Sequence, residues 1–358
     1  MAKDRDNGLL PPAQAETPCL VIDQAAVRHN LAKVLEICGG AERLVPHVKT
    51  HRAPWLIADL VRQGLAAFKA ATPAEVEMVL DAGAAEVVWA YPSLNAGAVA
   101  RVIAAARAHP AARVSALVHD VAGLEIWRRC LGPARPARVG LRVDLDPGMN
   151  RTGLPLGEAA AAMARVLAED ELFAGWHLYD GHIGDTDIER RRARVTDLAA
   201  RLSEFLDAVQ PGRDARQVIV GSSYTFDLWP RSDGLRVSPG SWVYSSLRHG
   251  RDLPHLGWRQ AAFVLTTVIR RTDADATLDA GAKAVGADLP LDTRFAWPGR
   301  IKLMSEEHTV VDGDGRALGE RILLTPGHAC TTAYLYPEAW VRDLGGDWQR
   351  RGQLGSRR

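Results

Sequence analysis

The sequence predicts an α/β fold, a (β/α)8 barrel of the TIM type followed by a smaller C-terminal β domain. Three observations predict this fold. Between residues 17 and 243, short apolar runs alternate with amphipathic, Ala-rich segments about eight times. The runs are continuously apolar, which is typical of parallel strands buried on both faces. After residue 253, β-like runs follow one another without long helices between them.

The elements of the barrel region follow in order. The first strand is predicted at 19–23 and the first helix at 25–37, where Val27, Leu31 and Val34 recur at helical spacing. Further strands are predicted at 43–46, 66–70, 86–90, 113–118, 139–143, 172–179 and 217–220. The helices between them are predicted at 54–63, 73–82, 96–108, 121–129, 155–169 and 188–209. This number of strands favours a closed barrel over an open doubly wound sheet.

The C-terminal region is predicted to be a β domain. Its strands are expected at 262–269, 276–279, 301–303, 308–311 and 321–325, with turns such as 312–315 (DGDG) between them. We therefore expect a barrel domain at 17–252 and a β domain at 253–345, against which residues 1–16 can also pack. Residues 346–358 are polar and glycine-rich and are expected to form a flexible tail.

Composition excludes several classes of protein. The formal net charge of +1, from 44 basic and 43 acidic residues, gives no global field that would attract nucleic acid or an anionic membrane. The N-terminus is charged and no apolar run follows it, so no secretory signal is expected. No stretch approaches the roughly 18 apolar residues of a membrane span. The four cysteines (Cys19, Cys38, Cys130 and Cys330) form no CxxC pair, so we expect a cytoplasmic protein without a disulfide framework.

Lys49 is the first candidate for chemistry, because it follows a predicted strand in the segment 46–51 (PHVKTH). Active sites of such barrels gather where strands end and the following loops begin. A partly buried lysine there can have a lowered pKa, so that its neutral amine attacks an aldehyde. A solvated lysine without a function is the other interpretation, and position alone leaves both open.

Other loops after predicted strands suit a phosphate-bearing aldehyde cofactor. Gly181 and His182 follow one strand. Gly221, Ser222 and Ser223 follow another and offer small hydroxyl groups and backbone N–H groups, as a phosphate site does. The segment 239–241 (PGS) lies where the last loops of a barrel commonly bind phosphate. Each segment alone is equally compatible with an ordinary turn.

A histidine and a cysteine near the C-terminus are candidate metal ligands. If the segment from His328 to Cys330 is extended, both side chains project to one side. An imidazole and a thiolate together suit Zn2+. The alternative is a packed histidine beside a small buried thiol. By the same alternation, His177 points to the same side as Tyr179 and faces either the core or a cofactor.

Taken in order, these motifs resemble the D-threonine aldolase/D-serine dehydratase family, whose barrel is similar to that of alanine racemase. The resemblance runs from residue 17 to 332 and is carried by 46–51 (PHVKTH), 146–153 (DPGMNRTG), 179–182 (YDGH), 239–241 (PGS), 279–283 (DAGAK), 305–308 (SEEH) and 326–330 (PGHAC). It departs from the family at Tyr224, which stands in a usually glycine-rich loop, and at Arg52, where a lysine is common. The segment 245–260 also matches poorly.

The resemblance implies pyridoxal phosphate and a divalent metal (Zn, Mn or Mg) as cofactors. It makes Lys49 the lysine that binds the cofactor as a Schiff base and places His182 near the substrate as candidate base. His328 and Cys330 would hold the metal. The remaining cofactor contacts that it implies are His47, Arg151, Tyr179 (facing the pyridine ring), Gly221, Ser222, Ser223 and Tyr244.

The implied reaction is retro-aldol cleavage of a D-β-hydroxy-α-amino acid to glycine and an aldehyde. The alternative is a dehydratase of D-serine or D-3-hydroxyaspartate that releases a 2-oxo acid and ammonia. An amino-acid racemase is less favoured, and a non-catalytic carrier of the cofactor would lack the β domain. The expected partner is a small D-amino acid, with no nucleic acid or membrane, and the resemblance implies a homodimer.

Overall fold

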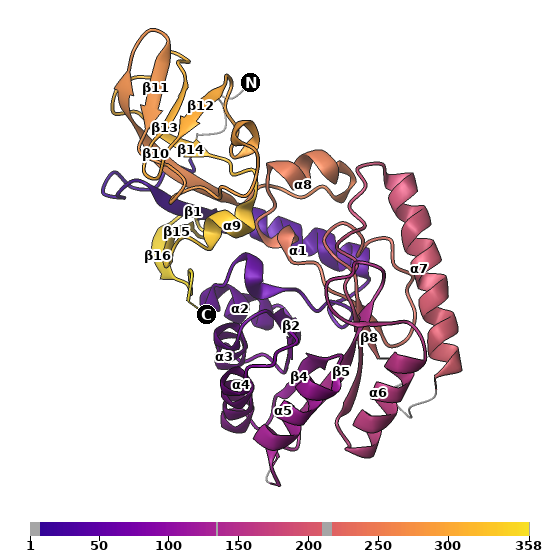
Figure 1. Cartoon of the computed structure of the whole chain (residues 1–358). Helices are drawn as coiled ribbons and strands as arrows, with labels where there is room; N and C mark the ends of the chain where they lie inside the picture. The colour runs from indigo at the N-terminus through magenta and orange to yellow at the C-terminus, as the bar shows by residue number, and fades with distance from the viewer. Residues whose placement is uncertain (1–7, 134, 210–216, 358) are drawn as a thin grey trace. The chain divides into compact units, whose positions relative to one another are not determined.

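The computed structural model describes residues 8–133, 135–209 and 217–357 (Figure 1). The chain forms two compact units. Leu35–Lys49 and Leu56–Gly240 make one, which we call the barrel unit. Residues 8–34, Thr50–Trp55 and Ser241–Arg357 make the other, which we call the β unit.

The barrel unit is built on a parallel sheet. Its strands are ordered β2 (Ala67–Ala70), β3 (Glu86–Trp89), β4 (Arg113–Val118), β5 (Val139–Asp146), β7 (Phe173–Leu178), β8 (Val218–Val220) and β9 (Leu235–Val237), and the short β6 (Leu154–Pro155) pairs with β5. Residues 44–47 complete the ring, because Leu44 bridges Val237 of β9 and His47 bridges Lys69 of β2, both in parallel. The predicted TIM-like barrel is confirmed. The predicted strand at 43–46 is present as these two bridges rather than as a regular strand.

Helices alternate with the barrel strands, as predicted. They are α1 (Gln24–Cys38), α2 (Pro54–Arg62), α3 (Pro73–Asp81), α4 (Ala96–Ala108), α5 (Val121–Leu131), α6 (Glu158–Glu169) and α7 (Ile188–Ala208), and α3 to α6 lie outside the strands in Figure 1. Side-chain caps set several starts: Thr72 accepts from the backbone N–H of Glu75, and Asp187 from that of Glu189. The sixth helix starts at Glu158 rather than residue 155, because Leu154–Pro155 pairs with β5.

The interior of the barrel is layered, because side chains along each strand point alternately inward and outward. A middle layer of aliphatic side chains packs together: Val45, Ala67, Val88, Leu117 and Ile219. Glu86, two residues before Val88, accepts from the guanidinium of Arg236 at 2.6 Å and 3.0 Å. Arg142 lies 3.6 Å from the same carboxylate. A buried ionic layer therefore underlies the aliphatic one.

The β unit is a mostly antiparallel sheet. Its order is β12 (Ile301–Met304), β13 (Thr309–Asp312), β11 (Asp275–Leu278), β10 (Ala262–Arg271), β1 (Cys19–Asp23), β15 (Glu338–Arg342) and β16 (Trp348–Gly352), and β14 (Arg321–Leu324) pairs with β10. Helices α8 (Leu247–Asp252) and α9 (Ala329–Ala333) also belong to it, as do 3-10 turns at Ser241–Val243, Pro254–Leu256 and Leu291–Thr293; a further turn, Val48–Thr50, follows residues 44–47. Its core includes Val264, Leu278, Phe295 and Leu324.

Two expectations about the ends of the chain are corrected. The strand at 19–23 is no barrel strand, because β1 pairs with β10 antiparallel and with β15 in parallel. The tail is not free, because β16 pairs with β15 along Glu338–Arg342. Arg52 fixes the residues that follow, since its guanidinium donates to the carbonyls of Gly355 and Arg357. This contact gives the arginine at the family's common lysine position a structural role.

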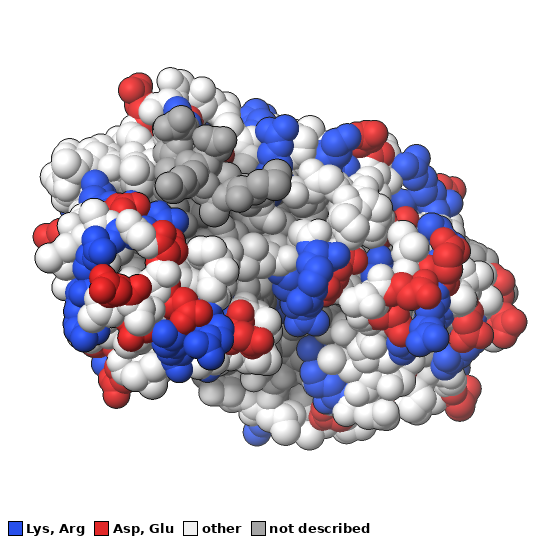
Figure 2. Space-filling view, turned by 90° about the horizontal axis from the view of Figure 1, so that it is seen from above, with Lys and Arg blue, Asp and Glu red and all other residues white. Residues whose placement is uncertain are grey.

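The surface carries mixed charge. Figure 2 shows basic and acidic side chains largely interspersed on the face drawn, in keeping with the net charge of +1. Among the helices that the structure describes, none is long and apolar enough to cross a membrane.

Candidate active site

A cavity of about 390 Å3 lies at the carboxyl ends of the barrel strands. His47, Lys49, Arg151 and Tyr179, four of the predicted cofactor contacts, line it. Lys69, Ala71, Ala90, Tyr91, Pro92, Leu117, Asp144, Thr152 and His177 complete the wall. The barrel unit thus brings together residues that lie far apart in the sequence, some within strands, such as Lys69 and Asp144, and others in the segments after strands, such as Lys49 and Arg151.

Three cationic groups surround the ring of Tyr179. The centroid of the ring lies 4.6 Å from the guanidinium carbon of Arg151, 5.6 Å from Nζ of Lys69 and 5.8 Å from Nζ of Lys49. His47 fixes the turn that carries Lys49, because its Nδ1 accepts from the backbone N–H of Lys49 at 3.3 Å. The cavity is therefore basic and has an aromatic wall, which suits a planar, anionic ligand.

Lys69, His177 and Asp144 form a buried hydrogen-bonded chain beside this ring. Nζ of Lys69 lies 3.4 Å from Nε2 of His177, and Nδ1 of His177 lies 2.8 Å from Oδ1 of Asp144. All three are at most 3% exposed. Burial and the charge of Lys69 lower the pKa of His177 against the pull of Asp144. The imidazole is therefore neutral near pH 7, with Nδ1–H donating to Asp144 and Nε2 accepting from Lys69.

Lys69 and Asp144 were not predicted from the sequence. A signal was present, because Lys69 interrupts a short strand whose other residues are Ala67, Phe68 and Ala70. A charged residue within a continuously apolar barrel strand must point either to a partner or to a cavity. For His177 the sequence left core and cofactor cavity open, and the structure places it on the cavity wall.

The loop after β8 is fixed by a buried carboxylate. Gly221 has a φ of +85°, and the backbone N–H of Ser222 donates to Oγ1 of Thr225 at 2.8 Å. Thr225 donates to Oδ1 of Asp180 and the indole N–H of Trp229 to Oδ2, each at 2.8 Å. Burial raises the pKa of Asp180, and both hydrogen bonds oppose this shift. Hydrogen bonds to Asp180 thus tie the loop to the residues after β7.

The same loop reaches the segment 239–241, as expected of a phosphate site. The backbone N–H of Gly240 donates to Oγ of Ser223 at 3.2 Å. Tyr224, the departure from the glycine-rich pattern, donates its backbone N–H to Oγ of Ser222 at 3.2 Å, and its ring lies 5.8 Å from the guanidinium carbon of Arg191. Its side chain is therefore held by a neighbour on α7.

His182 does not line the cavity. It lies in the turn after β7, where the backbone N–H of Ile183 donates to the carbonyl of Asp180. Its Nδ1 is buried and has no hydrogen-bond partner among the described residues. Its role as a base stays a prediction.

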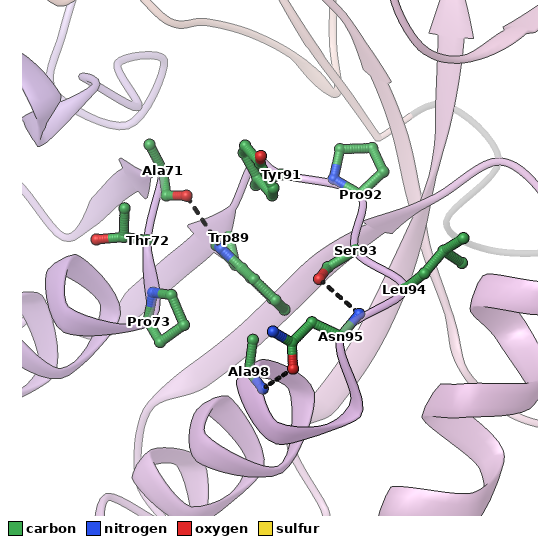
Figure 3. A pocket seen from close by; sticks show the side chains of 10 residues that line it. All are labelled: Ala71, Thr72, Pro73, Trp89, Tyr91, Pro92, Ser93, Leu94, Asn95 and Ala98. Carbon is green, nitrogen blue, oxygen red and sulfur yellow. Dashed lines mark hydrogen bonds between the residues drawn. The ribbon is translucent and has the colours of Figure 1, made fainter. Parts of the chain in front are cut away.

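A second hollow, of about 450 Å3, adjoins the cavity and shares Ala71, Tyr91 and Pro92 with it. Figure 3 shows the Trp89 ring at its centre, where the indole N–H donates to the carbonyl of Ala71 at 3.3 Å. On its other side Asn95 caps α4 by accepting from the backbone N–H of Ala98. A ligand group that extends past Tyr91 would enter this hollow.

The candidate metal ligands of the β unit converge, although by a geometry other than the predicted one. His328 is the cap residue of α9 and Cys330 lies within that short helix, so the expected extended segment is corrected. Nδ1 of His328 lies 2.5 Å from Oδ2 of Asp288. Burial alone would lower the pKa of His328, but hydrogen bonds with Cys330 and Asp288 raise it to about 9. The imidazole of His328 is therefore held between the Asp288 carboxylate and the Cys330 side chain.

Further groups surround Cys330. Its Sγ lies 3.3 Å from Oγ1 of Thr50 and 3.9 Å from Oγ of Ser241. Tyr244, a predicted phosphate contact, is fully buried and its hydroxyl has no partner among the described residues. Burial and the neighbouring Cys330 raise its pKa. In the described part of the chain, no group of three or more His, Cys, Asp or Glu side chains is arranged to hold a metal ion.

Comparison with known families agrees with this geometry. The family described as alanine racemase, N-terminal domain, matches residues 22–247, which is more than half of the chain. The chain belongs to the alanine racemase N-terminal domain family. A second family, described as a putative serine dehydratase domain, matches residues 261–342. The predicted resemblance to this group of enzymes is thereby confirmed.

Solved structures resemble this member of the alanine racemase N-terminal domain family along nearly its whole length. D-threonine aldolase from Filomicrobium marinum has a TM-score of 0.86 and 25% identity, over 97% of both chains. D-threo-3-hydroxyaspartate dehydratase from Delftia sp. HT23 has a TM-score of 0.75 and 22% identity, over 95% of this chain and 98% of that one. Alanine racemase from Clostridium difficile 630, in complex with cycloserine, has a TM-score of 0.71 and 12% identity, over 94% and 99%. No curated protein matches the chain.

The alanine racemase N-terminal domain family implies pyridoxal phosphate, and the cavity fits this group. Lys49 is exposed and lines the cavity, so it offers an amine to a ligand. Tyr179 offers an aromatic face, and Arg151 and the two lysines offer positive charge to an anionic ligand. The loop at 221–223 carries hydroxyl groups of the kind that hold a phosphate, but its residues are not among those that line the cavity.

Proposed function

We propose that this protein is a lyase, dependent on pyridoxal phosphate and a divalent metal, that cleaves D-β-hydroxy-α-amino acids to glycine and an aldehyde. One observation carries the proposal: a basic cavity lined by Lys49, in a chain that resembles a D-threonine aldolase over 97% of both chains. Lys49 would hold the cofactor covalently, Tyr179 would pack against its ring, and Arg151 and His47 would complete the wall. When bound, the cofactor supplies an electron sink for the bond that breaks at Cα.

We propose His328 and Cys330 as the metal ligands. Because Asp288 occupies Nδ1 of His328, Nε2 is left for a metal, an arrangement that is common around zinc-bound histidines. Two of the similar dehydratase structures are a His-to-Ala variant and a Cys-to-Ala variant, the latter in a metal-free form, and the two substituted positions are two residues apart. The same residue types at the same spacing support this assignment. A metal there would supply a Lewis acid.

His182 is the proposed base that takes the proton of the β-hydroxyl group. It follows the aromatic wall of the cavity in the turn after β7, and its buried Nδ1 leaves only Nε2 to face solvent or a ligand. The resemblance also leads us to propose a cytoplasmic homodimer that acts on a small D-amino acid, without nucleic acid or a membrane as partner.

A dehydratase is the second candidate, and the His-x-Cys spacing shared with the D-threo-3-hydroxyaspartate dehydratase favours it. Such an enzyme would release a 2-oxo acid and ammonia from the same class of substrate. A racemase would use neither the metal nor the β-hydroxyl group.

One incubation separates these reactions. The purified protein, loaded with pyridoxal phosphate and Zn2+, Mn2+ or Mg2+, is given D-threonine. Acetaldehyde with glycine supports the aldolase, 2-oxobutanoate with ammonia supports the dehydratase, and L-allo-threonine formed after chelation, by inversion at Cα alone, supports a racemase. If neither set of lyase products forms from D-threonine or from D-3-hydroxyaspartate, the proposal is contradicted.

The cofactor assignment has its own test. The wild-type protein should show the visible absorption band of a lysine-linked cofactor, and Lys49→Ala should lose it. Lys283→Ala, which removes an exposed lysine of the β unit, is the matched control and should keep the band. A wild-type protein that stays colourless with pyridoxal phosphate would refute the assignment.

A further inference from the structure

A second lysine of the cavity, Lys69, has no role in the function proposed above. It belongs to β2, whose four residues are all buried, and it is 3% exposed. Burying an amine this deeply is unfavourable unless its charge is compensated or lost. Nevertheless, its Nζ reaches the same aromatic ring as Lys49, at 5.6 Å against 5.8 Å from the Tyr179 centroid. The cavity therefore presents two amines to one ligand.

His177, itself hydrogen-bonded to Asp144, orients the amine of Lys69. Because Nδ1–H of His177 donates to Asp144, its Nε2 is an acceptor, and the contact at 3.4 Å commits one N–H of Lys69 to it. The other positions on Nζ face the cavity that Lys69 lines. Asp144, His177 and Lys69 thus form a chain in which a buried carboxylate orients a neutral imidazole and the imidazole orients an acid–base amine.

The surroundings of Lys69 bring the pKa of its amine close to neutral pH, where the charged and the neutral form are both populated. Burial, and then the positive charge of Lys49, lower the pKa of Lys69 to about 7, and Arg151 adds to this effect. Asp144 and Asp180 oppose it. His47 and His177 also face the amine, and burial lowers the pKa of each, so both are neutral. The phenol ring of Tyr179 faces it as well, at 5.6 Å.

We propose that Lys69 is a second acid–base lysine of the active site, positioned by His177 and Asp144, and distinct from the lysine that holds the cofactor. Its Nζ exchanges one proton with the bound substrate: the ammonium gives the proton and becomes an amine, or the amine takes one and becomes an ammonium. Solvent restores the starting form, and no other bond changes. The catalytic part of this role rests on the lyase function proposed above.

The protonation state of Lys69 can be measured without any activity. The sequence contains six lysines, so the side chains can be followed by NMR with lysine labelled with carbon-13 at Cε, and Lys69→Arg identifies the resonance of Lys69. In the cofactor-free protein we expect this resonance to titrate near pH 7, whereas that of Lys283, an exposed lysine paired with Glu306, titrates above pH 10. Asp144→Asn should lower the midpoint of Lys69 and Lys49→Met should raise it. If the resonance of Lys69 titrates at the same high pH as that of Lys283, the proposal fails.

The second arm uses the holoenzyme. Lys69→Arg keeps a positive charge but offers no neutral amine, and Lys69→Met keeps the length of the chain without charge. Both should retain the visible band, with borohydride reduction followed by peptide mapping locating the cofactor on Lys49. Turnover should nevertheless fall by about 100-fold or more, the range of general acid–base catalysis. Ethylamine should restore part of the turnover of Lys69→Ala, in proportion to its free base if Lys69 takes the proton and to ethylammonium if Lys69 gives it.

The two proposals fail separately. If Lys69→Arg or Lys69→Met retains more than about a tenth of the wild-type turnover, the acid–base role is refuted and the lyase function stands. If the wild-type enzyme releases neither acetaldehyde nor 2-oxobutanoate, the lyase function fails, whereas the resonance of Lys69 still decides whether its amine titrates near neutrality.

Discussion

Replacing Lys69 with methionine should change how the stability of the cofactor-free protein depends on pH. In the unfolded chain Lys69 has its ordinary pKa of 10.5, and in the folded protein burial and the charge of Lys49 lower it to about 7. Between these values the unfolded state binds a proton that the folded state does not bind. The free energy of unfolding therefore rises with pH in this window, and this contribution is lost as the pH falls through 7.

The size of the effect follows from the same two values. One pKa unit corresponds to about 1.4 kcal/mol, so the whole window from pH 10.5 down to pH 7 is worth up to about 5 kcal/mol. Between pH 7 and pH 9 the part due to Lys69 is about 2 kcal/mol. Methionine has a similar length and no charge, so Lys69→Met lacks this contribution. The lost hydrogen bond to His177 adds an offset that changes little over this range, because His177 stays neutral.

Urea unfolding at pH 7, 8 and 9 measures the difference between the two proteins, and groups that titrate alike in both cancel. The stability of Lys69→Met relative to the wild type should fall by about 2 kcal/mol between pH 7 and pH 9. Lys283→Met is the control and should show no such trend, because Lys283 is exposed. A difference between Lys69→Met and the wild type that stays constant from pH 7 to pH 9 would show that Lys69 is charged in the folded protein throughout.

Two further predictions concern the supports of the cofactor and metal sites. Asp180→Ala leaves the Thr225 hydroxyl and the Trp229 indole N–H without their acceptor. It should therefore lower the free energy of unfolding by about 3 kcal/mol in urea titrations and weaken binding of pyridoxal phosphate. Unchanged affinity for the cofactor would show that the loop does not need this anchor. Asp288→Asn should weaken Zn2+ binding by about 10- to 100-fold in calorimetry, because Nδ1 of His328 loses its carboxylate; equal affinity in variant and wild type would exclude His328 as a ligand oriented in this way.

The local sequence pattern was sufficient to predict most helices and strands, but not which strands pair with one another. The strand at 19–23 has the same apolar run as a barrel strand, and its partners β10 and β15 lie more than 200 residues further along the chain. Nothing within the strand distinguishes the two sheets. Trp348–Gly352 is mostly exposed and contains two arginines, so it resembles a polar tail although it pairs with β15 as an edge strand.

The candidate site was predictable where a motif stands next to a strand end. Lys49 and Tyr179 could be placed because the carboxyl ends of barrel strands share one rim. Asp144 could not, because it lies inside a strand and its function depends on a histidine from another strand. The prediction of an extended segment at His328 was wrong because α9 has five residues, too few for a helical period to be visible in the sequence.

The aliphatic layer inside the barrel has a consequence for how readily this protein can change its chemistry. Val45, Ala67, Val88, Leu117 and Ile219 form an aliphatic plug inside the barrel, and Leu117 of this plug also lines the cavity. The polar side chains of the cavity come from different strands and are not part of the plug, so they can be varied together without changing its packing. A library that varies His47, Lys69, Asp144 and His177 together, with the plug left intact, should therefore give a high fraction of folded variants and is the natural place to search for new reactions on this scaffold.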